Sequence, residues 1–389
     1  MDRIDQIIRF IRDLYKNSGD YIPLHAPAFK GMEKEYLLNC LESTFVSSVG
    51  KYVNEFENEI AKYCGAKQAI ACVNGTSALH LALKLIDVEA NTEVITQPLT
   101  FVATANTISY CGGKPIFIDV DIDTMGLSPV KLNKWIQKEV KLVANSNTKQ
   151  LEPINKKTGR KISACVPMHT FGHPCRIDEI IQICDQYSIP VIEDATESLG
   201  SFYKGVHTGI NGKIGVLSFN GNKIITTAGG GMLLFNNDEN LAKKAKHLST
   251  QAKVPHLWEF YHDEIGFNYR LPNLNAALGL AQLAQLERIL DSKRKIAQEY
   301  SRFFKEIGIK YMEEPELSRA NYWLNCILLK DKNEKEQFLK HTNQNNIMTR
   351  PAWKLMVDLP MYKTCERDDL ENAYYLADRL VNLPSSYIL

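Results

Sequence analysis

The sequence predicts an α/β protein with a mostly parallel sheet. Between Gln68 and Phe235, short apolar runs typical of strands alternate with segments whose apolar residues recur at helical spacing. This alternation is typical of strands joined by helical crossovers, which place parallel strands side by side. Several of the apolar runs also end directly in small polar residues, which is where the ligands of open α/β sheets bind.

The expected elements fall into three parts. Amphipathic helices are expected before the sheet, over 4–15, 32–41 and 53–64. The expected strands are 68–73, 93–96, 116–120, 162–168, 190–193, 214–219 and 232–235, and the helices among them are 78–85, 101–111, 129–140 and 177–187. The polar, lysine-rich segment 143–161 is expected to be an exposed excursion. One long helix is expected over 275–304. The segment 322–389 is expected to form short strands and helices.

Composition changes after about Leu248, which suggests a domain boundary. We expect residues 1–250 to hold the N-terminal helices and a large α/β domain. Residues 251–389 are expected to form a small α+β C-terminal domain.

Composition and charge exclude several classes of protein. The 389 residues are 44% hydrophobic and 23% charged, which is ordinary for a globular protein of about two domains. The net charge of +1 provides no global field for nucleic acid or an anionic membrane. Nine scattered cysteines, without a CxxC pair or zinc-ligand spacing, favour a reducing cytoplasm, and no signal-peptide layout or membrane-spanning run is expected.

A single lysine stands between two strand-like runs, in backbone rich in glycine. Lys223 follows the run that ends at Phe219 and precedes the three glycines 229–231. A lone lysine in such a place is more often a solvated turn residue. The alternative is a lysine whose partly desolvated amine forms a Schiff base.

Two further strand ends carry chemistry. Asn74-Gly75-Thr76-Ser77 joins a strand to a helix, where free N–H groups favour phosphate, although Ser or Thr there is often only an N-cap. Asp194 follows another apolar strand. Pyridoxal phosphate needs three kinds of group: hydrogen-bond donors to its phosphate, a carboxylate for its pyridine nitrogen and a lysine for its aldehyde. No P-loop, HExxH or GxSxG motif is present, and no metal site is expected.

With these motifs in order, the chain resembles the DegT/StrS family of sugar aminotransferases, from about Ile22 to its end. The resemblance implies the aspartate-aminotransferase (fold type I) architecture of pyridoxal-phosphate enzymes. Its five motifs are Asn74–Ala78, Pro98–Ala103, Glu193–Ala195, Ser218–Lys223 and Gly266–Arg270. A narrower resemblance, in 47–50, 168–174 and 254–260, is to the branch that makes 4-amino-4,6-dideoxy-N-acetylhexosamines on nucleotide carriers for bacillosamine- or legionaminic-type sugars.

The resemblance also implies residue roles. The catalytic residues would be Lys223, which holds the cofactor as a Schiff base, and Asp194, which pairs with the pyridine nitrogen. The phosphate would bind Gly75, Thr76 and Ser218, with Phe101 stacked on the ring in place of an ordinary core role, and Glu197 near the ring oxygen. Asn268 would be a phosphate ligand donated by the neighbouring subunit of a homodimer, with Arg270 fixing that loop.

Substrate contacts are a weaker implication. Candidates are His169, His256, Arg270 and Arg350; the histidines read equally well as buried or surface residues, and a lone arginine is more often a surface charge.

The implied activity is transamination from L-glutamate to C4 of a UDP- or GDP-linked 2-acetamido-2,6-dideoxy-hexos-4-ulose. It is most like the transaminase that makes UDP-4-amino-4,6-dideoxy-N-acetyl-alpha-D-glucosamine, for a bacterial surface glycan or nonulosonic acid. Alternatives are a dehydratase of the same family, which would carry histidine in place of Lys223, a 3-keto-sugar aminotransferase and a non-catalytic sensor. Ala228 stands where the family motif has glycine. If that position needs a positive φ, the alanine costs about 1 kcal/mol.

Overall fold

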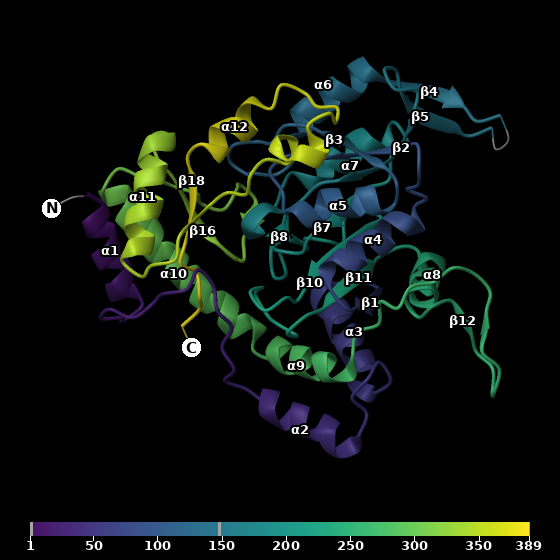
Figure 1. Ribbon diagram of the computed structural model, residues 1–389, viewed down its shortest axis with the longest axis horizontal. Helices are drawn as coiled ribbons and strands as arrows, with labels where there is room; N and C mark the ends of the chain where they lie inside the picture. The colour runs from purple at the N-terminus through teal and green to yellow at the C-terminus, as the bar shows by residue number, and fades with distance from the viewer. Residues whose placement is uncertain (1–2, 147–148, 389) are drawn as a thin grey trace.

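The structure, a computed structural model, describes residues 3–146 and 149–388 (Figure 1). Its α-helices are α1 (Arg3–Leu14), α2 (Glu33–Ser43), α3 (Lys51–Cys64), α4 (Gly75–Leu85), α5 (Val102–Tyr110), α6 (Pro129–Glu139), α7 (Ile177–Asp185), α8 (Glu239–Ser249), α9 (Asn273–Leu283), α10 (Leu286–Glu306), α11 (Lys332–Gln344) and α12 (Glu371–Ala377). Its strands are β1 (Gln68–Cys72), β2 (Thr92–Thr96), β3 (Lys114–Phe117), β4 (Val140–Ala144), β5 (Leu151–Asn155), β6 (Lys161–Val166), β7 (Ile192–Asp194), β8 (Phe202–Tyr203), β9 (Val206–His207), β10 (Ile214–Ser218), β11 (Gly231–Phe235), β12 (Lys253–Val254), β13 (Tyr261–His262), β14 (Lys310–Tyr311), β15 (Ser318–Arg319), β16 (Asn325–Leu328), β17 (Arg350–Pro351) and β18 (Leu380–Leu383).

The central sheet has the order β1-β11-β10-β7-β6-β2-β3. Two hydrogen-bonded groups, β1-β11-β10-β7 and β6-β2-β3, meet through parallel bridges between Cys165 and Val191 and between Met168 and Asp194. Strand β11 runs antiparallel to both of its neighbours, whereas β10–β7, β6–β2 and β2–β3 are parallel pairs. The predicted α/β class with a mostly parallel sheet is therefore confirmed.

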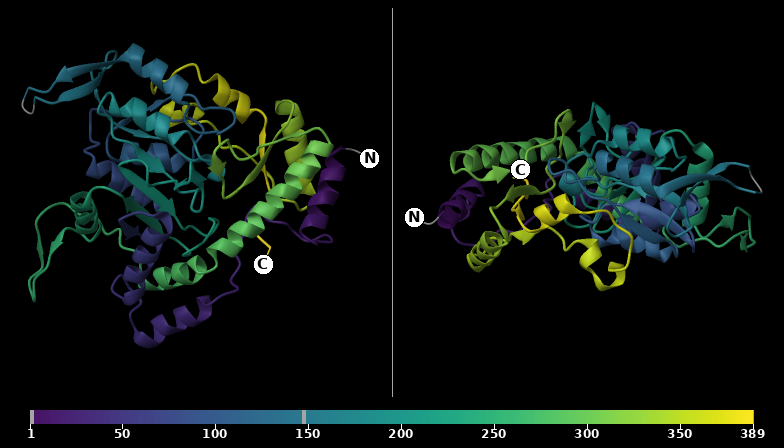
Figure 2. Two further views of the ribbon diagram at one scale, coloured as in Figure 1. Left: turned by 180° about the vertical axis from the view of Figure 1, so that it is seen from behind. Right: turned by 90° about the horizontal axis from the view of Figure 1, so that it is seen from above.

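Helices cover both faces of this sheet, as the two further views show (Figure 2). Alternate residues of a strand point to opposite faces, so each strand supplies two cores. In β1, Ile70 and Cys72 pack in the cluster that includes α4 and α8, while Ala69 and Ala71 pack in the cluster with α3 and α9. Near β2 and β3, the second face is covered by α6 and α7.

The smaller C-terminal sheet has the order β14-β16-β18-β17 and shares its core with the start of the chain. The apolar face of α1, which carries Ile7, Ile8 and Ile11, is buried in one cluster with Phe304 of α10 and Val381 of β18. Figure 1 shows α1 beside α10 and α11, far from the central sheet. The division near residue 250 stays a prediction, and α1 packs with the C-terminal part rather than with the large sheet.

Three segments differ in detail from the sequence-based expectation. The excursion at 143–161 contains most of an antiparallel hairpin, β4–β5, which joins the sheet at Lys161, the first residue of β6, and projects from the molecule (Figure 1). The single helix expected over 275–304 is two helices, separated at Ala284 and Gln285, and the Gln285 amide donates to Glu33. The segment after Leu248, which has no clear period, forms a second projecting hairpin, β12–β13.

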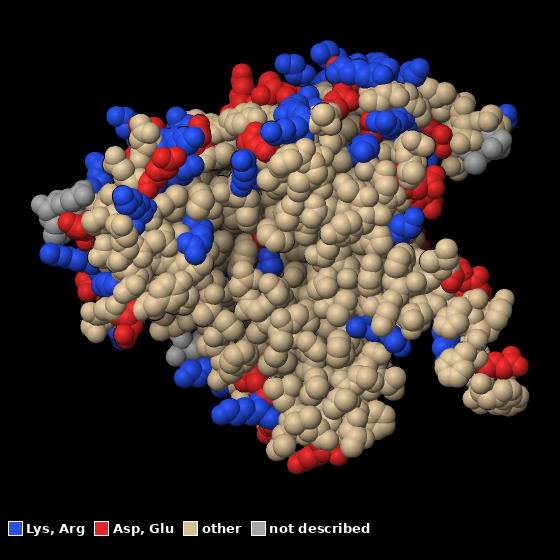
Figure 3. All heavy atoms as spheres, viewed as in Figure 1, with Lys and Arg blue, Asp and Glu red and all other residues tan. Residues whose placement is uncertain are grey.

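On the face shown in Figure 3, basic and acidic side chains are interspersed around the rim. Lysines and arginines gather at the top, over α6, whereas the middle of this face is largely uncharged. Among the helices of the described residues, none combines the length and the apolar character that crossing a membrane requires.

Candidate active site

A cavity of about 320 Å³ opens where the central strands end. Strand β1 ends before Asn74, β7 at Asp194 and β10 at Ser218, and all three residues line this cavity. Seven of the predicted cofactor-binding residues meet here, namely Gly75, Thr76, Phe101, Asp194, Glu197, Ser218 and Lys223. The cavity lies at the carboxyl ends of strands, where the ligands of open α/β sheets bind.

The first wall is the start of α4. The Asn74 side chain accepts a hydrogen bond from the backbone N–H of Ser77 at 2.7 Å and so caps the helix. Gly75 comes next, and a Cβ built there would lie 2.9 Å from Cβ of Ser218. Glycine is thus required for the close approach of this turn to the end of β10. The helix N-terminus and the Thr76 and Ser218 hydroxyls offer donors to a phosphate in the space between.

The second wall carries a buried carboxylate. Asp194 is 1% exposed, its Oδ2 accepts a hydrogen bond from the Thr104 hydroxyl at 2.7 Å, and its Oδ1 accepts one from the backbone N–H of Thr196 at 3.2 Å. Thr104 also contacts the hydroxyl of Thr100 at 2.8 Å. Sequence reasoning missed Thr104, because one threonine in a helical segment is not distinguished by any motif.

The third wall holds Lys223. Its Nζ lies 3.2 Å from Oε1 of Glu197 and 4.0 Å from the centre of the Trp323 ring, and its side chain is 13% exposed. The Trp323 indole donates to the carbonyl of Asn222 at 2.6 Å, which fixes the backbone next to the lysine. Oε2 of Glu197 accepts from the backbone N–H of Phe171 at 2.9 Å. Burial raises the pKa of Glu197 to about 7, although Lys223 opposes the shift.

This raised pKa predicts a pH dependence of stability in the cofactor-free protein. Between about pH 4.5 and pH 7, folded Glu197 keeps a proton that the unfolded chain has lost, so its contribution to stability falls as pH rises. Above pH 7 the contribution of Glu197 to the unfolding free energy is lower by up to about 3 kcal/mol than it is below pH 4.5. Glu197→Gln removes this pH-dependent contribution. The unfolding free energy of the variant minus that of the parent is therefore expected to be more positive at pH 8 than at pH 5. Urea unfolding at both pH values measures it, and an equal difference at both would contradict it.

Aromatic side chains, namely Phe101, Trp323 and Trp353, form part of the cavity lining. Phe101 is 49% exposed, so it is not an ordinary core phenylalanine, and its ring meets Trp353 edge-on with centroids 6.2 Å apart. Trp353 also lies against Phe171, at 4.6 Å. Trp323 and Trp353 come from the C-terminal part, and their positions gave no sequence signal.

Four of the other predicted residues lie outside the cavity of their own chain. Asn268 pairs with Thr250, and Arg270 donates from Nε to Oδ1 of Asn268 at 3.2 Å. His256 is exposed, and its Nδ1 accepts from the backbone N–H of Glu259 at 2.9 Å. Arg350 is exposed and donates to the Asn343 side chain at 2.9 Å.

His169 needs a correction. It is fully buried, its Nε2 lies 3.0 Å from Glu193, and its Nδ1 accepts from the backbone N–H of Cys175 at 3.2 Å. With both ring nitrogens occupied and no exposed surface, it does not line the cavity. The structure therefore does not support direct contact between His169 and a substrate.

Ala228 has φ of +66°, so the position does require the left-handed region. Ala228→Gly removes a steric cost of about 1–2 kcal/mol and adds about 0.5–1 kcal/mol of chain entropy. We expect a net gain of up to about 1.5 kcal/mol in unfolding free energy, measured by urea denaturation. The matched change Ala242→Gly, inside α8, should destabilise instead, and a loss of stability in Ala228→Gly would contradict the expectation.

The residues of the cavity fit pyridoxal phosphate. A glycine turn at a helix N-terminus, which a Cβ would fill, matches a phosphate. A buried carboxylate matches a protonated ring nitrogen, and an amine about one-eighth exposed matches an aldehyde.

Comparison with known proteins agrees with this geometry. The family model described as the DegT/DnrJ/EryC1/StrS aminotransferase family matches residues 27–389. The chain is 37% identical over 342 residues to the putative pyridoxal phosphate-dependent aminotransferase EpsN of Bacillus subtilis, covering 88% of this chain and 84% of that protein. It is 36% identical over 365 residues to the GDP-perosamine synthase of Escherichia coli O157:H7, covering 94% and 93%.

A solved structure extends the similarity to three dimensions. The crystal structure of a DegT DnrJ EryC1 StrS aminotransferase from Brucella abortus superimposes with a TM-score of 0.78 at 26% identity. The superposition covers 91% of this chain and 90% of that one.

Proposed function

Since this chain belongs to the DegT/DnrJ/EryC1/StrS aminotransferase family and is a sugar aminotransferase with pyridoxal phosphate as its cofactor, we propose the reaction it catalyses. It moves an amino group from L-glutamate to C4 of a nucleotide-linked 4-keto-6-deoxy-N-acetylhexosamine. The product is a 4-amino sugar for a bacterial surface glycan or nonulosonic acid. The observation that carries the proposal is the meeting of Lys223, Asp194 and the Gly75 turn in one cavity.

The cofactor supplies a carrier for the amino group and a ring that takes up the electrons released when a C–H bond breaks. The chain's residues supply the rest. Asp194, held by Thr104, would keep the proton on the ring nitrogen in place. The amine of Lys223 would move a proton at the substrate carbon that loses or gains the amino group, which requires it to be neutral at that moment. The pair with Glu197 puts a proton acceptor 3.2 Å from that amine.

A second candidate has a specific observation in its favour. A relative that aligns with almost the whole chain is named a GDP-perosamine synthase. The second candidate is therefore a GDP-linked 4-keto-6-deoxyhexose without the acetamido group. Phe101, Trp323 and Trp353 line the cavity and offer flat apolar faces to a sugar ring in either candidate.

The test is a direct assay of the holoenzyme with L-glutamate and each keto-sugar in turn. The substrates are the UDP- and GDP-linked 2-acetamido compounds and the GDP-linked compound with a 2-hydroxyl group. We expect a 4-amino product by mass spectrometry with a UDP- or GDP-linked acetamido sugar, and 2-oxoglutarate in equal amount. Product from the 2-hydroxy sugar alone would select the second candidate, and no amino sugar from any of them would overturn the assignment.

We also propose that the protein is a homodimer whose two cavities are each completed by the other chain. In this chain Asn268 and Arg270 are outside the cavity, in a stretch bridged to the end of edge strand β1. The projecting hairpin just before this stretch exposes large apolar side chains, including Leu257, Trp258 and Phe260. Exposed apolar groups of this size favour burial against a second copy.

The shared-site proposal predicts complementation. A chain with Lys223→Ala and a chain with Asn268→Ala should each be inactive alone. After subunit exchange, a heterodimer has one cavity with both defects and one with neither, so activity should return to up to about one quarter of the parent value in an equal mixture. Differently tagged chains verify the exchange. A mixture that exchanges fully and stays inactive would refute shared cavities.

A further inference from the structure

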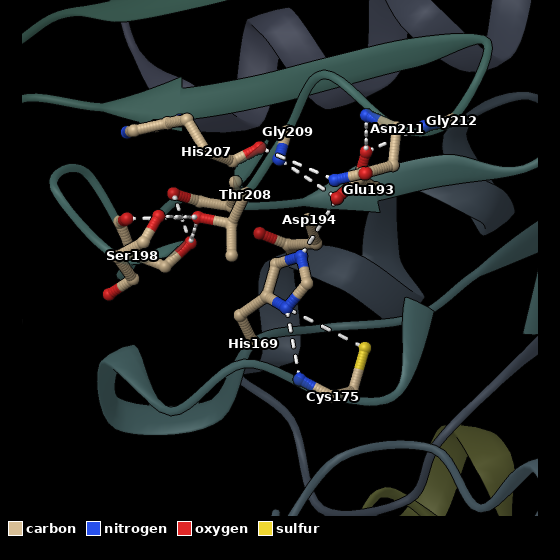
Figure 4. A network of polar contacts seen from close by, with 12 residues as sticks. His169, Cys175, Glu193, Asp194, Ser198, His207, Thr208, Gly209, Asn211 and Gly212 are labelled. Atoms are coloured by element: carbon tan, nitrogen blue, oxygen red, sulfur yellow. Dashed lines mark hydrogen bonds and ion pairs between the residues drawn. The ribbon is translucent and has the colours of Figure 1, made fainter. Parts of the chain in front are cut away.

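The residue before Asp194 is the centre of a polar network (Figure 4). Glu193 is 0% exposed, and its carboxylate accepts hydrogen bonds from three backbone N–H groups: Asn211 at 2.6 Å, Gly212 at 2.6 Å and Gly209 at 2.8 Å. Its fourth partner is Nε2 of His169, at 3.0 Å. A buried carboxylate with this many donors is rigidly held.

The protonation of this network follows from its geometry. The backbone N–H of Cys175 points at Nδ1 of His169, so the ring N–H that Glu193 accepts is that of Nε2. Burial alone would raise the pKa of Glu193. The His169 and backbone hydrogen bonds outweigh that effect and hold the pKa below its ordinary value, so the carboxylate is ionised.

This network connects the segments that place the reacting groups. Glu193 and Asp194 are neighbours on β7, so their side chains point to opposite faces, and only Asp194 lines the cavity. The backbone N–H of His169 donates to the carbonyl of Asp194 at 3.1 Å, and the N–H of Asp194 donates to the carbonyl of Pro167 at 2.9 Å. The segment 209–212, bound to Glu193, leads directly into β10, which ends at Ser218.

We propose that Glu193 and His169 are positioning residues that hold Asp194 at the angle at which its carboxylate faces the cofactor's ring nitrogen. They act through the backbone of Asp194, whose carbonyl accepts the N–H of His169, while the hydroxyl of Thr104 binds the Asp194 carboxylate on the cavity side. The inference rests on the proposed role of Asp194. It adds that this role depends on a charged group on the other face of the sheet, which touches neither cofactor nor substrate.

The experiment compares four variants as purified holoenzymes. Glu193→Gln keeps the shape of the side chain, but its amide nitrogen cannot accept a backbone N–H. His169→Leu removes the donor to Glu193, and His169→Gln returns a donor near the position of Nε2. Glu139→Gln is the matched control, because Glu139 is also a buried glutamate paired with cations, but it lies on α6 and does not line the cavity.

Two readouts separate positioning from mere structural support. The first is the pH midpoint of the cofactor's visible absorption band, which responds to the charge at the ring nitrogen. The second is the division of the effect between kcat and KM. For Glu193→Gln and His169→Leu we expect a shifted midpoint and a kcat lowered on the order of ten-fold with little change in KM. His169→Gln should restore both toward the parent, and Glu139→Gln should change neither.

If Glu193→Gln and His169→Leu lower only the melting temperature of the cofactor-free protein, with midpoint and kcat at the parent values, the inference is overturned. Equal defects in His169→Leu and His169→Gln would also overturn it, and this comparison remains available if Glu193→Gln does not fold. A parallel Asp194→Asn variant separates this failure from that of the proposed function. Normal turnover in Asp194→Asn would refute the role of Asp194 itself.

Discussion

Asp194→Asn is expected to lower kcat of the aminotransferase by about two to three orders of magnitude while leaving the fold intact. An amide cannot stabilise a positive ring nitrogen, and loss of one such electrostatic partner in an enclosed site costs roughly 3–4 kcal/mol. The fold should tolerate the change because the hydroxyl of Thr104 can donate to an amide oxygen as it does to Oδ2.

The measurement is steady-state kinetics with L-glutamate and the keto-sugar, with circular dichroism as the check on folding. Thr104→Ser keeps the hydroxyl and is the control, with turnover close to that of the parent. If Asp194→Asn turns over nearly as fast as the parent, Asp194 is not the partner of the ring nitrogen.

Lys223→Ala is expected to abolish turnover and to leave the cofactor bound. The turn at Gly75 and the carboxylate of Asp194 remain, and Glu197, without its cation, can take up a proton because burial has already raised its pKa to about 7. Borohydride treatment of the parent should fix the cofactor covalently to Lys223, and peptide mapping identifies the labelled residue. The variant should bind cofactor that dialysis removes and that borohydride does not fix.

Lys213→Ala is the matched control, since Lys213 lies ten residues earlier on an exposed turn and pairs with Asp238. It should keep both activity and label. A label on any other lysine, or turnover by Lys223→Ala within ten-fold of the parent, would contradict the assignment. The outcome also discriminates against the dehydratase alternative, in which no lysine is bound to the cofactor.

The sequence was most informative where a single segment carries both a strand and the chemistry at its end. The runs that end at Asn74, Asp194 and Ser218 are short and apolar and stop at small polar residues, so both the strand and its functional edge could be read from local pattern. The direction of β11 could not be read in this way. It depends on the loop 219–230, which contains Lys223 and reverses the chain so that Gly231 pairs with Ser218.

The parts of the site that sequence reasoning missed all depend on distant contacts. Thr104 meets Asp194 across 90 residues, and Trp323 reaches Asn222 across 101. Neither threonine nor tryptophan is unusual in its local segment. The break between α9 and α10 has the same origin, because the Gln285 side chain is bound by Glu33, 252 residues earlier in the sequence. Local periodicity contains no trace of such pairs.

The position of α1 has a consequence for synthesis of the chain on the ribosome. Its apolar face, with Ile7, Ile8 and Ile11, is made long before its packing partners Phe304 and Val381. Since chains are synthesised at about 5–20 residues per second, that face has no native packing partner for roughly 20–75 seconds. The large sheet can assemble in the meantime, so α1 is one segment of the nascent protein that chaperones or other chains would be able to bind.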